Sequence, residues 1–287
     1  MPPFVYREYS QQALDDQYNT RLTAPDFAQI FERWAEDSVK ARQAGSTTLD
    51  VAFGPSPDET LDVFHAKATG APIQIFFHGG YWRSMHKNDF AFLAPPFAAS
   101  GAVAVVPNYS LCPGVTMDTL IEQCRRAVDW THKNARQIGG DPGRIYISGH
   151  SAGGHIVAMM LATDWAKRGL PAESIKGACA ISGLYDLEPI RLSFLNVDVR
   201  LTPEMAARNS PIAIMRKKAP PTILTLGALE SAEFHHQTAR YEAVLRQAGT
   251  AVAVMDEAGL HHFTVLDAFC DRGHALGRAV LKQMGLG

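Results

Sequence analysis

Residues 149–153 read Gly-His-Ser-Ala-Gly, the spacing of a nucleophile elbow, which is a tight turn that lifts a serine hydroxyl above a β-sheet. Such a turn needs a buried strand before the serine and a helix after it. Residues 144–148 are a short apolar, β-branched run, and residues 152–167 are rich in Ala, Met and Leu and contain no proline. Both conditions are met, so the sequence predicts Ser151 as a nucleophile that takes up an acyl group.

A serine hydroxyl is a weak nucleophile at neutral pH, so it needs a general base and a carboxylate that orients this base. With this type of elbow the acid follows the serine in the chain, after a later strand. The predicted strand 222–226 leads to Glu230 and Glu233. We favour Glu230, because Glu233 falls in the first turn of the next predicted helix, where a carboxylate serves the helix dipole. Asp186 is an alternative acid, although capping the segment that follows suits it better.

The base is expected in the loop after the last predicted strand, residues 251–255. That loop holds His261 and His262, and its position favours His262 as the base. His261-His262 and His235-His236 do not indicate a metal site, because no His-Glu-x-x-His pattern or carboxylate cluster accompanies them. We therefore expect neither a metal nor a cofactor.

A tetrahedral intermediate also needs backbone N–H groups that stabilise its oxyanion. The predicted strand 73–77 runs into His78-Gly79-Gly80-Tyr81-Trp82, and paired glycines allow N–H groups to point at an oxygen without an intervening Cβ. Taken alone, these glycines would indicate a plain turn. Together with the elbow, the acid and the histidine, they predict an oxyanion hole at Gly79, Gly80 and Tyr81, completed by the N–H of Ala152.

Residues near these motifs in the chain are the expected walls of a substrate pocket. By proximity in sequence we assign substrate contacts to His78, Trp82, Tyr185 and Phe263, with Tyr81 and Phe194 as further aromatic walls. His150 and His155 flank the elbow, and we expect them to be packed, hydrogen-bonded histidines and not ligands.

The elements that position these residues alternate along the chain. Residues 10–43 carry a helical pattern, which predicts an N-terminal helical extension over residues 1–44. Predicted strands are 47–53, 60–66, 73–77, 102–107, 144–148, 177–182, 222–226 and 251–255, and predicted helices are 117–138, 152–167, 232–247 and 263–284. This alternation indicates a single α/β domain over 1–287, with a mostly parallel sheet between two helical layers. Residues 185–221 break the rhythm and are expected to be a small cap inserted over the site.

Composition narrows the partners of this 287-residue chain. Its net charge of -2 offers no basic field for nucleic acid, and no stretch approaches the apolar length that spans a bilayer. The first residues lack the basic and apolar segments of a secretion signal, and the four cysteines are scattered without metal or disulfide spacing. We expect a cytoplasmic protein with a small-molecule substrate and no membrane partner, and the sequence is compatible with a homodimer.

His-Gly-Gly-Tyr-Trp at 78–82 and Gly-His-Ser-Ala-Gly-Gly-His at 149–155 together resemble the arylformamidase (kynurenine formamidase) family of serine α/β-hydrolases. The His-Gly-Gly-x-Trp form separates this family from the broader His-Gly-Gly-Gly lipases and esterases. Residues 16–21, 182–189 and 230–234 also resemble family segments, so the likeness covers nearly the whole chain. By position, Ser151, Glu230 and His262 match the family triad, although the family often has aspartate where this chain has Glu230.

The resemblance implies an α/β-hydrolase fold and hydrolysis of N-formyl-L-kynurenine to L-kynurenine and formate, through a formyl-serine intermediate, in tryptophan catabolism. The same group of residues also cleaves esters, so a carboxylesterase for short-chain or aryl esters is the alternative function. A non-catalytic receptor with this fold would typically have lost the serine or the histidine. This chain keeps both Ser151 and His262.

Overall fold

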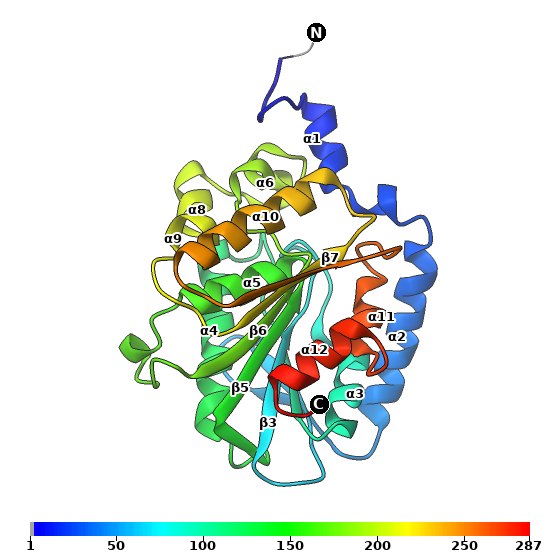
Figure 1. Ribbon diagram of the computed structural model, residues 1–287, viewed down its shortest axis with the longest axis vertical. Coiled ribbons are helices and arrows are strands. Elements are labelled where there is room, and N and C mark those ends of the chain that lie inside the picture. The colour runs from blue at the N-terminus through cyan, green and yellow to red at the C-terminus, as the bar shows by residue number, and fades with distance from the viewer. Residues whose placement is uncertain (1–2) are drawn as a thin grey trace.

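Eight strands form one mixed sheet in the computed structural model, which describes residues 3–287 (Figure 1). The order across the sheet is β1-β2-β4-β3-β5-β6-β7-β8. β2 runs antiparallel to both of its neighbours, and all other pairs are parallel, which confirms the predicted α/β-hydrolase sheet. The strands are β1 (Thr47–Ala52), β2 (Thr60–Phe64), β3 (Ala71–Phe77), β4 (Val103–Pro107), β5 (Gly140–His150), β6 (Ile175–Ile181), β7 (Thr222–Gly227) and β8 (Val252–Glu257).

Side chains alternate between the two faces of the sheet and build a separate core on each face. In β3, Ile75 and Phe77 point into one core while Phe76 points into the other. The first core is covered by α4 (Met117–Asn134), α5 (Ala152–Ala162) and α10 (Ala232–Gln247). The second is covered by α2 (Phe27–Gln43), α3 (Ala94–Ala99), α11 (Val265–Cys270) and α12 (Ala275–Gln283), which lie on the right in Figure 1.

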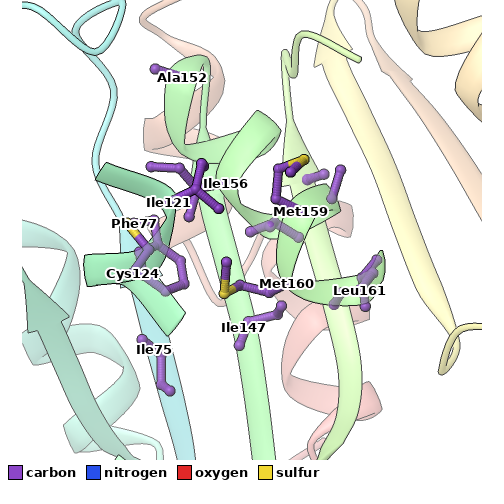
Figure 2. Packing of buried hydrophobic residues seen from close by; sticks show 14 of the residues in the cluster. Ile75, Phe77, Ile121, Cys124, Ile147, Ala152, Ile156, Met159, Met160 and Leu161 are labelled. Atoms are coloured by element: carbon purple, nitrogen blue, oxygen red, sulfur yellow. The ribbon is translucent and has the colours of Figure 1, made fainter. Parts of the chain in front are cut away.

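Helix α5 is the most enclosed helix of the first core, and ten of its eleven residues are buried. Figure 2 shows Ile156 and Met160 of α5 above Ile147 of β5, beside Ile121 and Cys124 of α4. A helix that is apolar all round is expected where neighbours surround it. This packing gives the residue at its N-terminus, Ser151, a rigid support.

The N-terminal extension is helical as predicted, but the helix is interrupted. α1 (Gln11–Tyr18) and α2 are separated by a 3₁₀ turn at Thr20–Thr23 and an irregular link. Pro25 disfavours helical backbone at the residue before it, which explains why α2 starts only at Phe27. The interruption brings residues 18–21 over the carboxyl ends of the central strands.

Residues 185–221 hold four short helices: α6 (Glu188–Leu192), α7 (Asn196–Val199), α8 (Pro203–Arg208) and α9 (Pro211–Ile214). Proline stands in the first turn of α6, α8 and α9, where its missing N–H costs no helix hydrogen bond. The helices pack against α1, α5 and α10, and Figure 1 shows them grouped beside α10.

Two helix predictions need correction. The predicted C-terminal helix 263–284 is divided into α11 and α12, because the chain turns at 271–274, where Asp271 accepts a hydrogen bond from the Gly273 N–H. α3 was missed because its first residues include Pro95 and Pro96, which favour a turn in sequence but also fit the first turn of a helix. No helix of residues 3–287 is long and apolar enough to cross a membrane.

Candidate active site

Ser151 lies at the junction of β5 and α5 in a strained backbone conformation, with φ 57° and ψ −116°. Its N–H donates to the Ile181 carbonyl at 2.8 Å. A Cβ at Gly149 would overlap the Gly153 carbonyl oxygen, and a Cβ at Gly153 would overlap the Phe77 carbonyl oxygen. The turn can therefore form only with glycine on both sides of the serine, which is the steric requirement of a nucleophile elbow.

The serine opens onto a cavity of about 520 Å³. Segments far apart in the chain form its wall. They are residues 18–21 and α2 of the N-terminal extension (residues 1–44), the loop after β3, the elbow, the segment 185–221 (called the insertion below) and the loop after β8. The lining residues are Tyr18, Asn19, Thr20, Arg21, Phe31, Trp34, Gly79, Gly80, Tyr81, Arg83, Ser84, Met85, Phe90, His150, Ser151, Phe194, His262 and Phe263.

Glu230 and His262 form a buried pair beside Ser151. The His262 Nδ1–H donates to Glu230 Oε2 at 2.6 Å, and both side chains are almost fully buried. The other oxygen, Oε1, accepts from Ser182 Oγ at 2.6 Å and from the Gly227 N–H at 2.8 Å. A carboxylate held at both oxygens fixes the imidazole tautomer that leaves Nε2 as the proton acceptor.

The structure shows which of the candidate acids and bases are in contact: Glu230 and His262 are paired, and the other candidates bond elsewhere. Glu233 lies in the first turn of α10, and its two carboxylate oxygens accept hydrogen bonds from Arg7 and Tyr18 and not from a histidine of the loop. His261 faces Asp26 instead, at 2.9 Å from Nε2 to the carboxylate. Asp186 pairs with Arg240, and it accepts from the Glu188 N–H, which is the capping contact expected from its position.

Ser151 Oγ and His262 Nε2 form no hydrogen bond with each other or with any other group of residues 3–287. Both residues line the same cavity. Contacts between a nucleophile and its base are often long before substrate binds and shorten in the complex. The fold thus places both residues at one cavity, and the hydrogen bond between Ser151 Oγ and His262 Nε2 is not yet formed.

The loop after β3 lies against the elbow at the expected place. Gly80 and Tyr81 have positive φ, 111° and 49°, which turns the chain sharply over Ser151. A Cβ at Gly79 would lie 3.1 Å from the His150 carbonyl oxygen, so the two turns are packed closely. Within residues 3–287 the N–H groups of Gly80, Tyr81 and Ala152 donate no hydrogen bond. This leaves them available to an oxyanion.

Three of the four expected substrate contacts lie elsewhere. His78, Trp82 and Tyr185 are completely buried and do not line the cavity, whereas Phe263 does. The His78 ring stacks on Tyr109 at 4.1 Å between centroids. The Tyr185 ring stacks on Tyr241 at 4.2 Å. Nearness to a motif in sequence does not determine which way a side chain points, so these residues support the site from within the core.

Trp82 connects the loop after β3 to α5. Its indole N–H donates to His155 Nδ1 at 3.1 Å, and His155 Nε2 donates to the Asn209 carbonyl at 2.8 Å. His150 Nε2 similarly donates to the His262 carbonyl at 2.7 Å. Both histidines are hydrogen-bonded and packed, as expected from the sequence. Burial lowers the pKa of His155 to about 4, so it is neutral at pH 7 and can accept from the indole.

The N-terminal segment and Ser182 are the parts of the site that sequence reasoning missed. Residues 18–21 form a wall of the cavity, whereas the insertion contributes only Phe194 to the lining. The Ala24-Pro25 pair signals the break in the helical pattern, but not where the freed segment would lie. Ser182 follows β6 with φ 49° and begins the family-like segment 182–189, but nothing in that sequence assigns its hydroxyl to the acid.

Comparison with known proteins identifies the class of this site. A family model described as alpha/beta hydrolase fold matches residues 74–266. Kynurenine formamidase from Danio rerio is 32% identical over 293 residues, covering 98% of each chain, and that from Salmo salar is 32% identical over 287 residues, covering 97% of this chain and 96% of the relative.

Esterases are also similar to the chain. Esterase LipQ from Mycobacterium tuberculosis is 30% identical over 301 residues, covering 91% of this chain and 71% of the relative. The crystal structure of EstE1, a thermostable carboxylesterase from a metagenomic library, superposes with a TM-score of 0.72 over 92% of this chain and 97% of that chain at 21% identity. At that identity the likeness concerns the fold alone.

Proposed function

We propose an arylformamidase activity for this chain, which belongs to the kynurenine formamidase family of α/β-hydrolases. The proposed reaction is hydrolysis of N-formyl-L-kynurenine to L-kynurenine and formate. The observation that carries it is the likeness to two kynurenine formamidases over nearly the full length of both partners. The buried contact of Glu230 with His262 beside Ser151 gives this likeness a chemical basis.

In the first half of the proposed reaction, Ser151 Oγ attacks the formyl carbon while His262 Nε2 takes its proton. The negative oxygen of the tetrahedral intermediate accepts hydrogen bonds from the N–H groups of Gly80, Tyr81 and Ala152. Loss of one such donor costs about 3 kcal/mol in comparable enzymes. The C–N bond then breaks, and protonated His262 gives the proton to the departing aryl amine, leaving a formyl ester on Ser151.

In the second half, a water molecule takes the place of the amine and gives its proton to His262 as it attacks the formyl ester. Collapse of the second tetrahedral intermediate returns the proton to Ser151 and releases formate. Glu230 keeps the imidazole in one tautomer through both halves and stabilises its positive form, because both carboxylate oxygens are held by hydrogen bonds.

The residues that line the cavity support an aromatic leaving group. Aromatic side chains from the N-terminal extension, the chain after β3, residues 185–221 and the loop after β8 line it: Tyr18, Phe31, Trp34, Tyr81, Phe90, Phe194 and Phe263. Aromatic surfaces of this kind bind an aryl ring by burial and by offset or edge contacts. A formyl group, in contrast, needs only the space between the elbow and the loop after β3.

The test is a comparison of kcat/KM for N-formylkynurenine and p-nitrophenyl acetate with the purified protein. The proposal expects formation of kynurenine and formate in equal amounts. Brisk hydrolysis of the ester with untouched N-formylkynurenine would instead establish the carboxylesterase alternative, which the likeness to esterase LipQ favours. Failure on both substrates would contradict either enzyme.

We also propose a cytoplasmic location and a small-molecule substrate as the principal partner. All four cysteines are free, which suits a reducing compartment. Cell fractionation with an antibody against the chain tests the location, and recovery in a secreted or periplasmic fraction would contradict it.

A further inference from the structure

The charged side chains that line the cavity are of one sign. Arg21 and Arg83 contribute guanidinium groups, and the lining contains no aspartate or glutamate. His150 adds no charge, because burial holds its pKa well below the usual value. A cavity with guanidinium groups and aromatic walls favours a ligand that carries both an aromatic ring and a carboxylate.

The charge of Arg83 is already matched within the protein. Its guanidinium pairs with Asp198 of the insertion, and it lies over the Phe194 ring at 5.6 Å from the ring centroid. This arrangement joins the loop after β3 to α7. Arg83 thus stabilises the wall of the cavity, and its charge is already paired and contributes little to binding a ligand.

Arg21 is different, because its side chain forms no ion pair and donates no hydrogen bond within residues 3–287. Its guanidinium carbon lies 4.7 Å from the centroid of the Phe27 ring. Stacking of this kind fixes the plane of the guanidinium while leaving its N–H donors free for a carboxylate. The group is therefore oriented but without an anionic partner.

The backbone that carries Arg21 is anchored on both sides of the cavity. Ser231 Oγ donates to the Gln17 carbonyl at 2.6 Å, and Tyr81 Oη donates to the Tyr18 carbonyl at 2.7 Å. Arg21 itself lies in the 3₁₀ turn that follows, and its carbonyl accepts a hydrogen bond from the Ala24 N–H. The guanidinium is thus presented by an anchored turn and not by a free terminal segment.

We propose that Arg21 binds the carboxylate of the substrate and selects aryl formamides whose amine portion carries a carboxyl group. This inference rests on the proposed arylformamidase function and names the residue that would bind the amino-acid part of the substrate. The carboxylate accepts N–H bonds from the Arg21 guanidinium at the mouth of the cavity while the aryl ring occupies the aromatic wall. Charge-assisted bonds of this type add affinity and fix the direction of the substrate.

The experiment compares N-formylkynurenine with its carboxamide, which has the same shape and keeps the α-ammonium group but lacks the carboxylate charge. Arg21→Gln should lower kcat/KM for the carboxylate substrate by about tenfold or more, as expected for a lost charge-assisted hydrogen bond, and leave the carboxamide unchanged. Arg21→Lys should retain part of the preference. The matched control is Arg136→Gln, which removes an exposed charge outside the cavity lining and should leave both substrates unchanged.

A second substrate pair separates this inference from the formamidase proposal. The acetate ester of 3-(4-hydroxyphenyl)propanoate and that of the corresponding propanamide differ only in the same charge. If esters alone are hydrolysed but Arg21→Gln abolishes a preference for the carboxylate ester, the formamidase proposal fails and the role of Arg21 holds. If Arg21→Gln slows the charged and neutral members of a pair equally, or changes neither, Arg21 does not select the carboxylate.

Discussion

Glu230 is held at both carboxylate oxygens, and its contacts show how a glutamate side chain is directed to the histidine. Ser182 Oγ and the Gly227 N–H hold Oε1, which directs Oε2 to His262. The three contacts lie in a buried setting, where an unpaired carboxylate would be costly. The choice of Glu230 over Glu233 could be made from position in sequence, whereas the support from Ser182 could not.

Glu230→Gln is expected to lower kcat by about 10⁴-fold, because the amide favours the tautomer that places a proton on His262 Nε2. The measurement is steady-state kinetics on the best substrate, with circular dichroism to confirm folding. Glu233→Gln is the matched control and should keep kcat within about threefold, since the buried Glu233 carboxylate bonds to Arg7 and Tyr18 and not to His262. A larger loss in Glu233→Gln than in Glu230→Gln would reverse the assignment of the acid.

At the scale of elements, two contacts hold the loop after β3 in place. Trp82 connects it to α5 through His155, and the Tyr81 hydroxyl connects it to the N-terminal segment. These contacts give a physical reason for the tryptophan of the His-Gly-Gly-x-Trp motif. The residue is buried and positions the loop through its N–H.

Trp82→Phe should destabilise the protein by about 2 kcal/mol, because His155 Nδ1 is left without its donor in a buried site. Urea unfolding gives the stability, and kcat is expected to fall as the loop loosens. Trp130→Phe on α4, whose indole is only half-buried, provides the comparison and should cost less. Equal costs for the two variants would show that the contact with His155 adds nothing.

Tyr81→Phe removes the hydrogen bond to the Tyr18 carbonyl without changing the backbone N–H groups of the loop. The N-terminal wall of the cavity should then be held less firmly, so KM is expected to rise several-fold with little change in kcat. The two constants are measured separately on N-formylkynurenine. A fall in kcat at constant KM would mean that the hydroxyl supports the oxyanion hole instead of the wall.

The order and type of most elements could be predicted from hydrophobic pattern and turn residues, because each strand and helix carries its own local signal. The path of residues 19–26 could not, since the chain just before it is anchored at the Gln17 and Tyr18 carbonyls by Ser231 and Tyr81, which are distant in sequence. The hydrophobic pattern also could not predict the directions in which the His78 and Trp82 side chains point. A turn with positive φ at Tyr81 and Trp82 redirects successive side chains, so the period of a strand no longer applies.

At the scale of the whole molecule, buried neutral histidines connect stability to pH. Burial lowers the pKa of His78 and His155 to about 4, from an ordinary value of 6.5. Between these values the unfolded chain binds more protons than the folded chain, so acid favours unfolding. The stabilisation is complete above pH 6.5 and is lost progressively as the pH falls toward 4.

We therefore expect the free energy of unfolding to decrease from pH 7.5 to pH 5, by about 2 kcal/mol for each of these two histidines. Urea titrations at several pH values measure it. His155→Asn should show a shallower dependence because one of the titrating groups is gone. A stability that is constant over this range would contradict the neutral, buried state of both histidines.

The measurement that tests the central claim most directly is turnover of N-formylkynurenine by the protein and by Ser151→Ala, side by side. The account predicts that the unchanged protein releases kynurenine and formate in equal amounts and that Ser151→Ala loses about 10⁶-fold in kcat, as in other serine hydrolases. Retained activity in Ser151→Ala would remove the elbow from the mechanism and contradict the account.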